Sequence, residues 1–83
     1  MARQRKLNRQ TQKIIDAAIC LQVLGEARAD TDTHIAAAFV LDRQEYLPAG
    51  YEMVAAWDQL DHTRQEYVRL IKRDHMDIID AHY

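Results

Sequence analysis

Only two glycines and one proline interrupt this sequence of 83 residues, and they stand at positions 25, 48 and 50. Few residues therefore need special backbone angles, while Ala, Leu, Ile, Gln, Arg and Glu are plentiful, a composition that favours α-helix. No segment gives a convincing strand pattern. A chain of this length forms one domain and buries about 60–65% of its unfolded surface, so it can support one modest core.

The first two helices are predicted from apolar spacing and from capping residues. Asn8 is a plausible N-cap, and Gly25 stands where a glycine ends a helix, which predicts a first helix from about Asn8 to Leu24. Its broad apolar face comprises Ile14, Ile15, Ala18, Ile19, Leu21 and Leu24. Residues 26–33 form a polar connector, and a second helix is predicted from His34 to about Glu45.

The Leu47-Pro48 step is the clearest break in the sequence. Proline excludes α geometry from the residue before it and suits the first turn of a following helix. Tyr46 and Tyr51 have the spacing of a hydrophobic staple around that start. We therefore predict that a third helix begins at Pro48, although Gly50 is a poor helix former.

The end of this third helix is open between two interpretations. Six polar residues, 61–66, interrupt the apolar stripe, and the capping-box spacing of Thr63 and Glu66 favours a fourth helix from about Arg64 to Asp80. The alternative is one helix from Pro48 to Asp80, about 50 Å long, which would need a partner chain to cover it.

The predicted fold is thus all-α, a bundle of three or four helices or one that includes a single long C-terminal helix. About half of the residues are apolar, and they spread over broad helix faces. Such faces can exceed what one small core covers, so we also predict a homodimer, the commonest oligomer.

Several classes of protein are disfavoured by what the sequence lacks. The single cysteine, Cys20, excludes an internal disulfide framework and suits a reducing compartment, and no apolar run approaches the ~20 residues of a membrane span. We therefore expect a cytoplasmic protein. No glycine-rich phosphate loop is present, and Cys20 stands among core-type residues, so we expect neither an enzyme nor a cofactor.

The weakest hypothesis is a metal site on Asp58, His62 and Glu66, which an unbroken helix would align.

The N-terminus is basic and the remainder is acidic. The first 13 residues carry five cations and no acid, whereas the other 70 carry 13 acids and six bases. We interpret residues 1–7 as a flexible basic arm and residues 8–83 as a single helical domain. The alternative function is a DNA- or RNA-binding regulator, with phosphate contacts from the arm and the last helix. The residues concerned are Arg3, Arg5, Lys6, Arg9 and Lys13, then Arg64, Arg69, Lys72 and Arg73.

The leading hypothesis is a small non-enzymatic regulatory protein that binds a protein partner through helical surfaces. An acidic body suits a basic partner, because complementary charge speeds association and selects partners. An inhibitor that occupies a nucleic-acid-binding surface would have this charge. Aromatic residues are frequent anchors at interfaces. The candidate residues are the acids Glu45, Glu52, Asp58 and Asp61 and the aromatic residues Trp57 and Tyr67.

Overall fold

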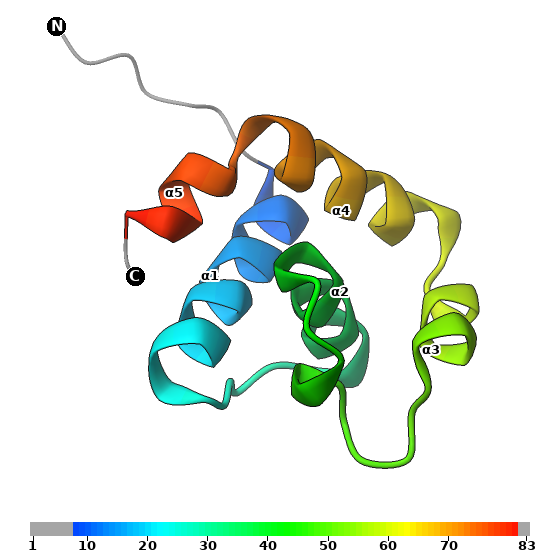
Figure 1. The fold of residues 1–83 in the computed structure, drawn as a ribbon. Helices are drawn as coiled ribbons and strands as arrows, with labels where there is room; N and C mark the ends of the chain where they lie inside the picture. The colour runs from blue at the N-terminus through cyan, green and yellow to red at the C-terminus, as the bar shows by residue number, and fades with distance from the viewer. Residues whose placement is uncertain (1–7, 82–83) are drawn as a thin grey trace, which may run out of the picture.

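The computed structural model describes residues 8–81, and all regular secondary structure within this range is helical, which confirms the predicted all-α class (Figure 1). A bundle of helices is a fair description of it, although it has more helices than predicted. The helices in chain order are α1 Arg9–Leu24, α2 Thr31–Leu41, the short 3-10 helix η1 Gln44–Tyr46, α3 Met53–Gln59, α4 His62–Asp74 and α5 Met76–Asp80. The predicted basic arm lies outside the described residues.

Both predicted ends of α1 are confirmed. The Asn8 side chain accepts a hydrogen bond of 2.7 Å from the Thr11 amide, which satisfies one of the free N–H groups of the first turn. At the other end Gly25 has a φ of 79°, and its amide donates to the Leu21 carbonyl. Glycine adopts this left-handed conformation without the cost that a side chain would impose.

Helix α2 begins and ends earlier than predicted. It starts at Thr31 after the N-cap Asp30, three residues before His34, and it ends at Leu41 rather than near Glu45. The end is set by Asp42, which has a φ of 55° and whose amide donates to carbonyls of the last turn. Aspartate is one of the few residues that tolerate this conformation, so the helix stops there.

The predicted helix start at Pro48 is wrong. The chain forms a turn, in which the Tyr51 amide donates to the Pro48 carbonyl at 3.2 Å and Gly50 has a φ of 91°. This positive φ cannot belong to a right-handed helix. Helix α3 therefore begins only at Met53, after the N-cap Glu52.

The single long C-terminal helix is also wrong, because the chain is extended at Leu60 and Asp61. The predicted break therefore exists, but α4 begins at His62 with Asp61 as its N-cap, not near Arg64 with Thr63 as its cap. A second break at His75 divides the predicted last helix into α4 and α5.

The core lies where α1 and α2 pack against each other and are covered by α4 and α5 (Figure 1). Its fully buried residues of largest volume are Ile14, Ile15, Leu21, Ile35, Val40, Val68, Ile71 and Ile79. Three consecutive alanines, 36–38, are buried on α2 and allow neighbouring helices to approach closely. Four residues of the predicted apolar face of α1, Ile14, Ile15, Ala18 and Leu21, are thus in the core, whereas Ile19 is partly buried and Leu24 is exposed.

Few large apolar side chains are left on the surface between Asn8 and Ala81. They are Val23 and Leu24 at the end of α1, which are 56% and 71% exposed, and Val54 on α3, which is 75% exposed. The apolar surface available to a second copy is therefore smaller than the composition suggested. No helix in this part of the chain has the length and apolar character needed to cross a bilayer.

Candidate protein-binding surface

Most of the net negative charge of residues 8–81 comes from one segment. We define the α3 segment as residues 44–61, which include η1, α3 and the loop between them. It contains four acids and no Lys or Arg, whereas the rest of the described chain contains nine acids and eight bases. The α3 segment therefore has a formal charge of −4, and the remainder, which we call the body, has a formal charge of −1.

The four acids of the α3 segment, all predicted as partner-binding residues, are exposed to solvent. Glu45 lies 3.6 Å from the Arg43 guanidinium, and Asp61 lies 3.0 Å from Arg64. Neither Glu52 nor Asp58 forms an ion pair with another described residue. Two carboxylates at the two ends of α3 are thus not neutralised by neighbouring cations of residues 8–81.

Helix α3 has two distinct faces. Ala56 is its one fully buried residue, and Met53 and Trp57 on the same side are half-buried. Val54, Ala55 and Asp58 are exposed, and at 100° per residue they fall within one 100° arc of the helix. We call these three residues the outer face of α3. This face carries an apolar residue, a small residue and a carboxylate.

Trp57 attaches α3 to the body. Its ring makes an edge contact with Phe39 of α2 at a centroid distance of 5.0 Å, and the Arg69 guanidinium lies 5.4 Å from its centroid. The Gln65 side chain of α4 donates a hydrogen bond of 2.8 Å to the Trp57 carbonyl. Trp57 therefore holds α3 against the body, and its side chain is half-buried.

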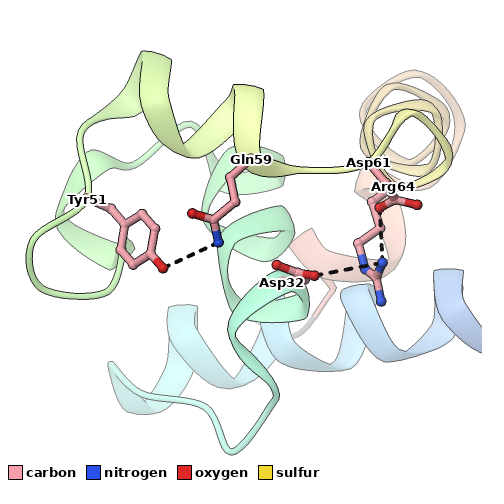
Figure 2. A network of polar contacts seen from close by, with 5 residues as sticks. All are labelled: Asp32, Tyr51, Gln59, Asp61 and Arg64. Atoms are coloured by element: carbon pink, nitrogen blue, oxygen red, sulfur yellow. Dashed lines mark hydrogen bonds and ion pairs between the residues drawn. The ribbon is translucent and has the colours of Figure 1, made fainter.

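A second polar contact joins the loop before α3 to the end of that helix. The Gln59 side chain donates to the Tyr51 hydroxyl at 3.3 Å, and Figure 2 shows the two side chains facing each other. This bond connects the loop before α3 to the last turn of the helix. It is exposed, so its contribution to stability is small.

Arg64 fixes the junction between α3 and α4. Its guanidinium donates to Asp61 at 3.0 Å and lies 4.0 Å from Asp32 at the start of α2 (Figure 2). The hydrogen bond from Arg64 lowers the pKa of Asp61 and raises that of Arg64 itself. Sequence reasoning placed Arg64 among the phosphate-binding candidates, whereas the structure gives it two carboxylate neighbours.

The basic residues of α4 are likewise accompanied by acids. Arg69 donates to Glu66 at 2.7 Å, Arg73 donates to Asp74 at 2.9 Å, and Lys72 pairs with Asp42 at the end of α2. Each of these three cations of α4 thus has a carboxylate neighbour. Arg9 and Lys13 are exposed on α1, and Arg3, Arg5 and Lys6 lie outside the described residues. The described candidates therefore lie on two helices, α1 and α4.

The remaining predicted site residues are Tyr67, a candidate for partner binding, and the metal candidates Asp58, His62 and Glu66. Tyr67 lies on α4, half-buried against the core, and is not part of the α3 segment. The break after Gln59 separates Asp58 from His62, so these two residues do not share a helix face as the metal hypothesis requires. His62 lies 3.8 Å from Glu66, but residues 8–81 contain no group of three possible ligands that could hold a metal ion.

Cys20 is half-buried rather than part of the closed core. It lines a groove of about 350 Å³ between α1 and the connector to α2. Two cations, Lys13 and Arg28, and two carboxylates, Asp16 and Asp30, also line this groove. Their formal charges cancel, so the groove offers no charge by which to select a ligand.

Sequence reasoning identified the four acids but missed Val54. The signal for the acids is simple, since the segment has no compensating Lys or Arg. Val54 carries no such signal, because its exposure depends on which face of α3 packs against α2.

Comparison with protein-family models, with curated proteins and with solved structures gives no match to this chain.

Proposed function

We propose that this chain is a small non-enzymatic regulatory protein that binds a protein partner through the α3 segment, as an inhibitor or adaptor. The observation that supports the proposal is the combination of a formal charge of −4 and a 75% exposed valine on a helix that packs mainly against α2. In Figure 1 this helix lies at one edge of the molecule, away from α1 and α5. Its outer face is therefore accessible to another protein.

The charge of the α3 segment favours a protein over a nucleic acid as its partner. Phosphate backbones are attracted by Lys and Arg, and this segment has neither. A basic protein surface, including one that itself binds nucleic acid, would instead be attracted. Blocking such a surface is one way in which the chain would inhibit its partner. A single half-buried cysteine suits a reducing compartment, so we place this activity in the cytoplasm.

Homodimerisation is a separate part of the proposal, and its support is limited to Val23 and Leu24 at the end of α1. A standard interface buries about 800 Å² on each partner, more than these two side chains supply. Light scattering at micromolar concentration tests this part, and a monomer would end it. The binding function of the α3 segment does not depend on the result.

The experiment that tests the function is affinity capture from an extract of the native cell, followed by chemical cross-linking of the captured protein. The wild-type chain is compared with Val54→Lys, which removes the apolar side chain of the outer face of α3 and places a charge there that repels a basic partner. Ala29→Lys is the matched control, since it introduces the same charge at an exposed residue of the body. We expect capture by the wild type and by Ala29→Lys, with cross-links in the α3 segment, and loss of capture with Val54→Lys. Equal capture by all three proteins would contradict the proposed surface.

A further inference from the structure

We propose that the occupant of the α3 segment is a basic amphipathic helix of the partner protein. Its apolar side would cover Val54, and its Lys or Arg side chains would lie against Asp58 and Glu52. This inference rests on the proposed function and names the chemistry of the partner.

Charge complementarity argues for a basic occupant. Glu52 and Asp58 have no ion pair among the described residues, so their carboxylates are available to cations of a partner. The nearby body is almost neutral and would add little repulsion. Ionic attraction between exposed groups is modest for each pair, but it acts in one direction across a segment that contains four acids and no base.

The shape of the outer face argues for a helix. Val54 and Asp58 are four residues apart on α3 and are therefore neighbours on adjacent turns. Ala55 beside them has a short side chain, which permits another helix to approach closely. Helices pack by seating the side chains of one helix between those of the other, so an apolar residue of the partner would be seated beside Val54 over Ala55.

The dimensions limit the affinity. Helix α3 has seven residues and is about 10 Å long, so it offers two turns to a partner. An interface built on two turns is at the small end of the known range, where complexes are weak and transient. The inference therefore predicts measurable but reversible binding of isolated peptides.

The test uses a phage-displayed library of random peptides of helical length, selected against the intact chain. Enriched peptides are synthesised and titrated by calorimetry. We expect them to carry net positive charge and apolar residues at helical spacing. Asp58→Lys and Glu52→Lys should each weaken their binding about threefold to tenfold, because each replaces an attraction by a repulsion. Val54→Lys should weaken it about tenfold or more, because it also removes the apolar contact. The matched control is Glu26→Lys, the same charge change at an exposed residue of the body, and it should leave the affinity within about twofold.

Three outcomes would overturn the inference, and they bear differently on the proposed function. Enriched peptides that have no net positive charge, but still lose affinity with Val54→Lys, would exclude a basic occupant and leave the α3 segment as the binding surface. Peptides that bind all variants equally would place binding elsewhere and contradict both proposals. A library that yields no binder would overturn the basic helix, while capture from the native extract would still decide the function. Asp58→Asn serves as a milder variant, should charge reversal alter the circular dichroism spectrum.

Discussion

The body and the α3 segment are both helical, but they differ in the surface they bury and in their charge. In the body, α1, α2, α4 and α5 bury their apolar faces against one another, and the cations of α4 lie beside acids. The α3 segment contributes Ala56 and Leu60 to the core, but it keeps Val54 exposed and has four acids and no base. The two regions therefore differ in net charge and in exposed apolar surface within a chain of only 83 residues.

The largest difference between the two regions should appear in their response to truncation of an aliphatic side chain. Ile35 is fully buried on α2, so Ile35→Ala should lower the free energy of unfolding by about 2–5 kcal/mol, through lost burial and a cavity. Val54→Ala should change it by less than about 0.5 kcal/mol, because the side chain is already in water. Urea denaturation followed by circular dichroism measures both values. Equal losses would show that α3 belongs to the core.

Removal of the aromatic contact should have a smaller effect. Trp57 is half-buried against Phe39, so Trp57→Ala should lower the free energy of unfolding by about 1–3 kcal/mol and loosen α3 from α2. Trp57→Phe preserves part of the ring contact and should recover at least half of that loss. The same denaturation experiment measures both variants. A loss below about 0.5 kcal/mol for Trp57→Ala would mean that other contacts hold α3 in place.

The ion pairs of Arg64 at the junction between α3 and α4 should contribute still less to the free energy of unfolding, and their contribution should depend on pH. Arg64→Met removes the exposed contacts to Asp61 and Asp32, which should cost about 0.2–1 kcal/mol at pH 7. Because folding lowers the pKa of Asp61, its contribution is present above the ordinary value of 3.8 and is lost as the pH falls below it. The difference between wild type and variant should therefore shrink below about pH 4. A difference that grows on acidification would contradict this sign.

The smallest effect is expected at the hydrogen bond between Tyr51 and Gln59. Tyr51→Phe removes the hydroxyl that accepts from Gln59 at 3.3 Å in an exposed position. The free energy of unfolding should fall by less than about 0.5 kcal/mol, because water replaces the lost partner. A larger loss in thermal or urea denaturation would show that the loop before α3 is a structural part of the body.

The sequence allowed parts of this structure to be predicted where the signal is local. Both ends of α1 follow from Asn8 and Gly25, whose side chain and backbone act within a few residues. Pro48 misled the prediction, because proline permits a helix start but does not require one, and the positive φ of Gly50 decided the path. The break at His75 has no local signal of this kind, and it was missed.

The proposed binding surface shows the same division. A segment without bases is visible in the sequence, so the four acids were identified. The role of Trp57 as a support depends on its contact with Phe39. The exposure of Val54 depends on the burial of Ala56, which determines the face of α3 that packs against the body. These are tertiary contacts, which residue spacing alone does not determine.

Native-state hydrogen exchange of the backbone amides tests the separation of the two regions most directly. The Ala56 amide, which donates to the Glu52 carbonyl at 2.8 Å, reports on α3, and the amides of Ile15 and Ile35 report on the body. If α3 is held to the body chiefly by Trp57, its amides should exchange through a local opening at least about 2 kcal/mol below the free energy of global unfolding. The body amides should require global unfolding. Equal protection of Ala56, Ile15 and Ile35 would show that α3 unfolds only with the core, and would contradict a separate binding segment.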